Sequence, residues 1–163
     1  TRGYRIPISD PAEGAPLLGV YGGKITSYRH LAEAAVDELA QRLPALSGPA
    51  WTARAPLPGG DFPREGQTAL IADLAARYPF LSRAEATRIG RAYGTRAERW
   101  LGGAKGRADL GRSFGAGLSE AEIAYLRAVE WARSAEDVLW RRSKLGLHMS
   151  EAERAEVEAF MGS

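Results

Sequence analysis

The 163-residue chain contains no cysteine and only two histidines, His30 and His148. Without thiols it can form neither a disulfide framework nor a thiolate metal site, and a cysteine nucleophile is excluded. The two histidines are too far apart for a local pair of ligands, so we expect no metal site and no zinc enzyme. No apolar run approaches the ~18 residues that a membrane span needs. What remains is an ordinary globular composition, with 45% hydrophobic and 26% charged residues.

Charge is distributed unevenly along the chain, although the net charge is only +2. Residues 77–117 carry nine Arg or Lys against three acidic residues, and residues 118–163 carry six against nine. This pattern predicts that the basic segment docks on the acidic one or forms a solvated face. An alternative is a non-enzymatic helical module that uses 77–117 to bind anionic lipid or nucleic acid. Few aromatic residues are interleaved with these cations, so we expect no nucleic acid partner.

The first part of the chain has the pattern of two strands and a helix. Residues 4–8 alternate between apolar and polar, with Pro7 restricting that strand to an edge or a bulge, and residues 17–21 form a short apolar run. A turn-rich stretch, 9–16, separates them. A helix with one apolar face follows over 28–43, capped by Thr26 or Ser27. Because two such strands need a sheet to join and no later segment has strand character, we interpret residues 1–48 as the end of a larger α/β domain.

The remainder, residues 49–163, is predicted to be a compact helical domain, which makes the chain mainly α. Four Ser/Thr-x-x-Glu capping boxes begin at Ser82, Thr95, Ser119 and Ser150, and Ser134 with Asp137 forms a weaker fifth. Four glycines lie where left-handed helix ends are expected, namely Gly94, Gly102, Gly146 and Gly162. The predicted helices are 67–78, 83–93, 96–101, 120–132, 135–145 and 151–161, with a long loop over 102–117.

All four tryptophans are interpreted as packing residues rather than as site residues. Trp131 and Trp140 fall among the apolar positions of the last helices, and Trp51 and Trp100 are interpreted in the same way.

One segment has the pattern of a binding site, namely Gly22-Gly23-Lys24-Ile25-Thr26 followed by Arg29. It has the order apolar strand, two glycines, helix start. Two glycines allow a ligand to approach the backbone closely, and the first amides of a helix attract negative charge. The pattern is neither a dinucleotide fingerprint nor a phosphate loop. It therefore predicts an anion or an electron-rich ring edge at this helix start, with an ordinary strand-to-helix turn as the alternative.

The chain resembles the C-terminal part of the aerobic, quinone-linked FAD-dependent glycerol-3-phosphate dehydrogenases. The resemblance rests on an ordered set of segments that spans almost the whole chain. They are LLGVYGGKITSYRHLAEAAVDEL at 17–39, GPAWTARAPLPGG at 48–60, RYPFL at 77–81, RAYGTRAE at 91–98, DLGRSFG at 109–115 and EWARSAEDVLWRRSKLGLH at 130–148.

The resemblance implies a function that neither composition nor spacing provides. Members of that family oxidise sn-glycerol 3-phosphate to dihydroxyacetone phosphate, with hydride transfer to FAD and electron transfer to membrane quinone. It implies that Gly22, Gly23, Lys24, Ile25 and Thr26 contact the flavin, that Lys24 acts at the substrate, and that Arg29 either contacts substrate or anchors the helix.

The resemblance also implies partners and a location. Residues 1–48 would end the FAD-binding domain, and 49–163 would brace it and contribute to a homodimer. The enzyme would be cytoplasmic and peripheral on the inner face of the cell membrane. Because the dinucleotide fingerprint is missing, we expect these 163 residues to be a fragment that neither binds FAD tightly nor turns over.

Overall fold

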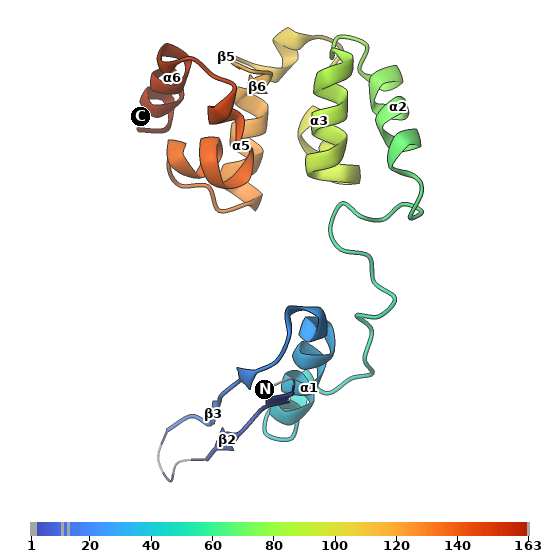
Figure 1. Ribbon diagram of the computed structural model, residues 1–163, viewed down its shortest axis with the longest axis vertical. Coiled ribbons are helices and arrows are strands. Elements are labelled where there is room, and N and C mark those ends of the chain that lie inside the picture. The colour runs from blue at the N-terminus through green and yellow to red at the C-terminus, as the bar shows by residue number, and fades with distance from the viewer. Residues whose placement is uncertain (1–2, 11, 13, 163) are drawn as a thin grey trace. The chain divides into compact units, whose positions relative to one another are not determined.

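A computed structural model describes residues 3–10, 12 and 14–162. The chain forms two compact units, an N-terminal unit of residues 1–56 and a helical unit of residues 57–163, which are described separately (Figure 1). The mainly helical fold class is confirmed. Among the described helices, none is both long and apolar enough to cross a membrane.

The N-terminal unit contains an interrupted antiparallel hairpin followed by a helix. The first strand pairs with the fourth and the second with the third, in the registers Tyr4 with Gly22 and Ile8 with Leu18. The interruption falls at Pro7, which has no amide to donate, although its carbonyl accepts a 2.9 Å hydrogen bond from the Gly19 N–H. Of the predicted turn, Pro11 and Glu13 lie outside the described residues. The elements are β1 (Tyr4–Arg5), β2 (Ile8–Ser9), β3 (Leu17–Leu18), β4 (Tyr21–Gly22), a 3-10 turn (Ile25–Ser27), α1 (Tyr28–Ala40) and a second 3-10 turn (Pro44–Leu46).

The N-terminal unit has no core of its own. Within the described part of residues 3–56 no side chain is buried. Large apolar side chains are instead exposed along the strands, along α1 and in the segment after it, namely Tyr4, Leu17, Val20, Tyr21, Ile25, Tyr28, Val36, Leu43, Leu46 and Trp51. Apolar surface of this extent is typical of a face that another part of a protein covers.

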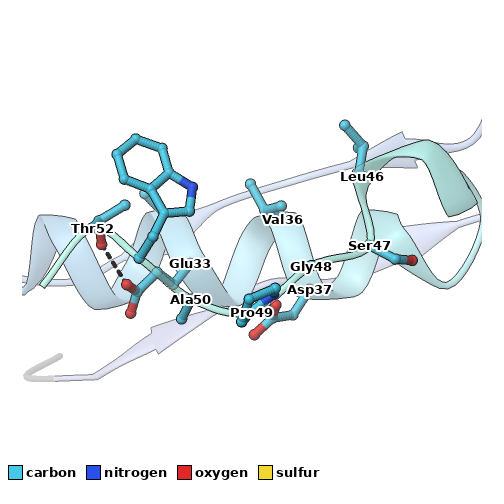
Figure 2. A pocket seen from close by; sticks show the side chains of 11 residues that line it. Glu33, Val36, Asp37, Leu46, Ser47, Gly48, Pro49, Ala50 and Thr52 are labelled. Carbon is cyan, nitrogen blue, oxygen red and sulfur yellow. Dashed lines mark hydrogen bonds between the residues drawn. The ribbon is translucent and has the colours of Figure 1, made fainter. Parts of the chain in front are cut away.

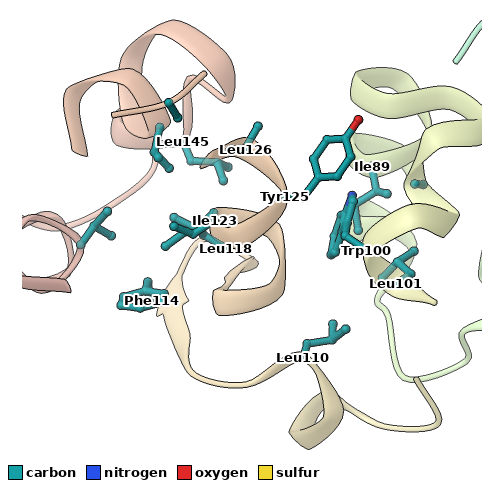
Figure 3. Packing of buried hydrophobic residues seen from close by; sticks show 14 of the residues in the cluster. Ile89, Trp100, Leu101, Leu110, Phe114, Leu118, Ile123, Tyr125, Leu126 and Leu145 are labelled. Atoms are coloured by element: carbon teal, nitrogen blue, oxygen red, sulfur yellow. The ribbon is translucent and has the colours of Figure 1, made fainter. Parts of the chain in front are cut away.

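The helical unit packs short helices and one small hairpin around a continuous apolar core. Figure 3 shows Tyr125 beside Trp100 and Ile89, while Phe114, Leu118 and Ile123 gather on the other side of the helix that carries Tyr125. The elements are α2 (Gln67–Arg77), α3 (Arg83–Tyr93), a 3-10 turn (Gly94–Ala97), α4 (Glu98–Leu101), a 3-10 turn (Arg107–Leu110), β5 (Ser113–Gly115), β6 (Leu118–Ser119), α5 (Glu120–Val129), a π-helical segment (Asp137–Arg142), a 3-10 turn (Leu145–Leu147) and α6 (Glu151–Gly162).

The prediction that 102–117 is a loop without strands is wrong. The segment folds into a 3-10 turn and the β5–β6 hairpin, in which Ser113 pairs with Ser119. Glycines at 115 and 117 adopt positive φ at the tight connection. Such a short hairpin leaves almost no alternation in the sequence, which is why the pattern missed it.

Two predicted helices end or wind differently from the prediction. Helix 120–132 stops at Val129, because the amides of Glu130 and Ala132 both donate to the Leu126 carbonyl around Trp131, whose φ is +56°. The segment predicted as helix 135–145 is a π-helix over 137–142, where the amide and hydroxyl of Ser143 donate to the Val138 carbonyl five residues back.

The capping predictions are confirmed at three positions. Ser82 forms both bonds of a capping box with Glu85, Ser150 does so with Glu153, and Ser134 exchanges equivalent bonds with Asp137. Ser119 accepts the expected amide hydrogen bond, but its partner side chain points elsewhere, as described below.

The prediction of a capping box at Thr95 is wrong. Thr95 lies inside a 3-10 turn and its hydroxyl donates to Asp61, while Glu98 pairs with Arg77 at 2.6 Å. Of the glycines predicted at left-handed helix ends, Gly94 and Gly102 have positive φ, but their ψ values of −135° and −133° lie outside the left-handed helical conformation. The left-handed residue in the 144–146 turn is instead Lys144, and Gly162 lies within α6.

An ion pair between a part-buried arginine and a buried glutamate joins α3 to α5. The two Arg88 Nη atoms lie 2.6 and 2.7 Å from the Glu122 carboxylate oxygens, and the Tyr93 hydroxyl donates to the same carboxylate at 2.6 Å. Arg88 also donates to the Gly117 carbonyl at 3.0 Å. Glu122 is fully buried, and burial raises the pKa of the Tyr93 hydroxyl above its usual range. With the Arg112–Glu156 pair, this contact confirms that the basic segment docks on the acidic one.

The ion pair between Arg107 and Glu85 should make the free energy of unfolding depend on pH. Arg107 donates to both oxygens of Glu85 at 2.8 and 2.6 Å, and this bond, with those to Ser82, lowers the pKa of Glu85 to about 2. Because the folded-state pKa lies below the ordinary value, the stabilisation is complete above pH ~4.5 and is lost as pH falls toward 2. We therefore expect the Glu85→Gln variant to lose less stability than the wild type between pH 5 and 3, measured by urea unfolding. Glu151→Gln is the control, and an unchanged pH slope in Glu85→Gln would contradict the assignment.

A close backbone contact at the end of α3 predicts a steric effect. A Cβ added to Gly94 would lie 1.9 Å from the Gly59 carbonyl oxygen, whereas one added to Gly102 would meet nothing within 4 Å. The two glycines have similar φ values, +56° and +51°. We expect Gly102→Ala to cost about 1–3 kcal/mol from backbone strain alone, and Gly94→Ala to cost about 2 kcal/mol more because the clash is added. Equal losses in thermal or urea unfolding would show that the clash is absent.

Candidate functional site

The predicted site begins where β4 ends and the chain turns into α1. Gly22 and Gly23 have φ values of +78° and +93°, which residues with a side chain rarely adopt. The Gly23 amide donates to the Gly3 carbonyl at 3.0 Å, which fixes the turn to β1. Lys24 is extended, and the chain then enters the 3-10 turn that leads into α1.

Three successive amides at this turn have no acceptor in the described part of the chain. The N–H groups of Lys24, Ile25 and Thr26 make no hydrogen bond there, whereas the next amide, that of Ser27, donates to the Lys24 carbonyl at 2.9 Å. The predicted side-chain cap is wrong, because the Ser27 hydroxyl donates to that same carbonyl at 2.8 Å and no hydroxyl accepts from the helix start. The amides therefore remain available to a ligand.

The surroundings of these amides are cationic and apolar. Lys24 and Thr26 are exposed, and Lys24 has no ion-pair partner among the described residues. Ile25 is 87% exposed beside them. Free amides attract negative charge, and an exposed aliphatic side chain suits the face of a ring. The turn thus fits the electron-rich edge of a planar cofactor or an anionic substrate group.

Arg29 lies on α1 but is engaged with protein groups. Its Nη1 atom donates to Glu33 at 2.9 Å and to the Thr52 hydroxyl at 3.4 Å, and Nη2 lies 2.8 Å from a ring nitrogen of His30. The Thr52 hydroxyl also donates to Glu33, and this bond, helped by Arg29, lowers the pKa of the Glu33 carboxyl. The network ties α1 to the segment after it, as an anchoring role requires; a substrate role for Arg29 stays a prediction.

A pocket of about 440 Å³ is lined by Glu33 and Thr52 of this network (Figure 2). Figure 2 shows Glu33 and Thr52 joined at one end and Leu46 at the other, with Val36 between them. Trp51 also lines it and is 69% exposed, so the prediction that Trp51 packs in a core is wrong. No set of three His, Asp or Glu side chains that could hold a metal ion occurs in the described residues.

The amino-acid sequence can be compared with those of known protein families. A family model described as the C-terminal domain of alpha-glycerophosphate oxidase matches residues 50–161. This chain belongs to that family. The match covers the helical unit almost completely.

Individual members of the glycerol-3-phosphate oxidase and dehydrogenase family match the chain over nearly its whole length. Glycerol-3-phosphate dehydrogenase of Pseudomonas aeruginosa is 48% identical over 100% of the chain, and aerobic glycerol-3-phosphate dehydrogenase of Escherichia coli is 42% identical over 99%. D-erythritol 1-phosphate dehydrogenase of Brucella abortus is 44% identical over 95%. The chain spans only 31%, 32% and 30% of these relatives, so it corresponds to about a third of each.

Several features outside the predicted site were not found from the sequence. The Arg88–Glu122 pair joins residues 34 positions apart, which no local motif records. Trp131, predicted to pack in a core, is 79% exposed, whereas Trp100, at 8%, is buried as predicted and Trp140 packs partly buried against the core.

Proposed function

We propose that this chain is the C-terminal part of a flavoenzyme that oxidises sn-glycerol 3-phosphate to dihydroxyacetone phosphate and passes electrons to a membrane quinone. The names of the relatives support the substrate and the chemistry. The observation within this chain that supports it most is the set of three free amides at Lys24, Ile25 and Thr26. FAD, when bound, supplies the hydride acceptor and the route for electrons to quinone.

In this proposal the residues of the turn serve the flavin edge and the substrate. Gly22 and Gly23 keep side chains away from the ring, while the amides of Ile25 and Thr26 stabilise negative charge that develops at its edge. Lys24 holds the substrate phosphate or balances charge as hydride leaves. Arg29 contributes by holding α1 against the segment that contains Thr52.

The helical unit braces the flavin-binding part and contributes to a homodimer, and the enzyme is peripheral on the cytoplasmic face of the membrane. The unit has its own core, whereas residues 3–56 expose apolar surface that a larger domain would cover. The alternative, a module that binds lipid or nucleic acid through 77–117, has less support, because Arg77, Arg88, Arg107 and Arg112 are ion-paired with carboxylates of the same chain.

The substrate class can be tested with two phosphorylated polyols. One relative is named for D-erythritol 1-phosphate, which shares a phosphomonoester and a polyol chain with glycerol 3-phosphate. We expect glycerol 3-phosphate to bleach the flavin of the full-length enzyme, the longer chain that includes the flavin-binding part, at lower concentration than D-erythritol 1-phosphate. The reverse order would assign the enzyme to the larger polyol phosphate.

The proposal also predicts how flavin content depends on chain length. The purified 163-residue chain should show no stoichiometric flavin absorbance, because it contains only one edge of the site. The full-length enzyme should contain about one FAD per chain, measured by absorbance after denaturation. A full-length enzyme without flavin would refute the proposed function.

A further inference from the structure

A second pocket, of about 540 Å³, lies in the helical unit. The residues that line it include two tyrosines, a tryptophan and two arginines, namely Tyr93, Tyr125, Trp131, Arg96 and Arg142. Tyr93 also donates to Glu122 in the ion pair between α3 and α5, and the site proposed at the 22–29 turn uses none of these residues.

Trp131 is placed here at a conformational cost and with little burial. Its φ of +56° lies in the left-handed region, where glycine is the usual residue at the end of a helix. The side chain is 79% exposed, so packing within the helical unit does not compensate for this backbone conformation. A strained, exposed aromatic residue indicates a role in binding.

The two arginines of the pocket are available for an anion. Arg142 donates through Nε to the Glu130 carbonyl at 2.7 Å, which orients its guanidinium, and neither Arg142 nor Arg96 has a carboxylate within ion-pair distance in the described chain. Five other arginines of the unit do have such partners, namely Arg77, Arg88, Arg107, Arg112 and Arg141. The Glu130 side chain also lines the pocket, but the contact that it makes is with the Tyr125 hydroxyl, at 3.4 Å.

We propose that this pocket is the surface on which the flavin-binding part of the full-length enzyme docks, with a carboxylate between Arg96 and Arg142 and an apolar side chain over Trp131. The inference rests on the proposed function, because it assumes that part. The relatives support this occupant, because the matched region is only about a third of each of them. The remaining two thirds of their chain supply a partner domain for an exposed surface of the helical unit. Arginine and tryptophan are the residues that most often dominate such interfaces.

Other occupants fit the charges less well. A two-fold contact between copies of this surface would bring the Arg96 and Arg142 pair of one copy toward that of the other, which like charges oppose. An anionic lipid surface would need a helix with a broad apolar face beside basic residues. The large exposed apolar residues that line this pocket are instead Trp131 and Val129, at a helix end.

Hydroxyl-radical footprinting with mass spectrometry tests the inference without measuring activity. In the 163-residue chain Trp131 should oxidise rapidly and the buried Trp100 slowly. In the full-length enzyme we expect the rate at Trp131 to fall at least fivefold, toward that of Trp100, while Leu147, 70% exposed and outside the pocket, keeps its rate. An unchanged rate at Trp131 in a full-length enzyme that holds FAD would overturn the inference and leave the proposed function standing; absence of FAD would refute the proposed function.

Two additions to this experiment address the other occupants. Protection of Trp131 in the 163-residue chain that grows with protein concentration would assign the surface to a second copy. Protection on addition of phosphatidylglycerol vesicles would assign it to a membrane. Either result would overturn the inference.

A glycine substitution separates docking from a structural role. Trp131→Gly relieves the left-handed backbone, so the thermal midpoint of the isolated chain should stay the same or rise. In the full-length enzyme the same substitution should lower the midpoint, as should Arg96→Gln, whereas Arg83→Gln, an exposed cation of α3 outside the pocket, should not. A fall in both forms of the protein would show that Trp131 serves the fold of the helical unit, and would overturn the inference.

Discussion

Replacement of Glu122 by glutamine should destabilise the helical unit by about 3 kcal/mol, the lower end of the cost of leaving a buried charge without its partner, because the Arg88 side chain is 21% exposed. Glu122 is fully buried and receives both Nη atoms of Arg88 together with the Tyr93 hydroxyl. The glutamine amide keeps one acceptor oxygen but carries no negative charge, so the Arg88 guanidinium loses the charge that balances it and one of its two carboxylate hydrogen bonds, and keeps its bond to the Gly117 carbonyl. The measurement is the free energy of unfolding from urea titration.

A double-mutant cycle shows whether this loss comes from the pair. The cycle compares the single variants Arg88→Met and Glu122→Leu with the double variant. The double variant removes both charges and keeps apolar volume, so its loss of unfolding free energy should be much smaller than the sum of the losses in the two single variants. Some loss remains, because the Tyr93 hydroxyl then lacks its acceptor. Additive losses, or a single loss below about 1 kcal/mol, would mean that the pair is not the buried contact described here.

Replacement of Lys24 by methionine in the full-length enzyme should reduce kcat/KM for glycerol 3-phosphate by about 10²–10³-fold, the effect of removing one group that stabilises charge at a reacting centre. Lys24 is exposed and unpaired in the described chain, so the substitution should leave the unfolding free energy unchanged. The matched control is Lys105→Met, an exposed lysine in the turn after α4. Equal activities for the two variants would remove Lys24 from the site.

Local features of this chain could be predicted from the sequence because the residues that determine them are neighbours. The capping box at Ser82 and the turn at Gly22 and Gly23 each depend on bonds within a few positions. The capping box predicted at Thr95 does not form, because the Thr95 hydroxyl donates to Asp61, which lies 34 positions away in the sequence. Local pattern alone cannot show that competition.

Features that depend on distant partners were missed for the same reason. Glu122 was assigned to a capping box, yet it shares a helical face with Leu126 and Val129, four and seven positions on. The position of the Glu122 carboxylate on an apolar helical face was the signal that this side chain would be buried and paired with a cation. The exposure of Trp131 had no such signal, because its left-handed backbone follows from two amides that converge on the Leu126 carbonyl.

The anchoring of Arg29 shows where the site could be predicted only in part. The sequence placed Arg29 near the turn and left its role open between substrate and helix. Its bond to Thr52 depends on how the chain returns after α1, which spacing does not fix. The free amides, in contrast, follow from the glycine pair and the helix start.

Hydrogen–deuterium exchange of the peptide that contains Lys24, Ile25 and Thr26 tests the central claim most directly. In the full-length enzyme stripped of FAD these amides should exchange rapidly, because no described group accepts from them. Addition of FAD should slow two or three of them at least tenfold, while peptides of α6 remain unchanged. Equal exchange with and without bound FAD would contradict the claim that this helix start holds the flavin.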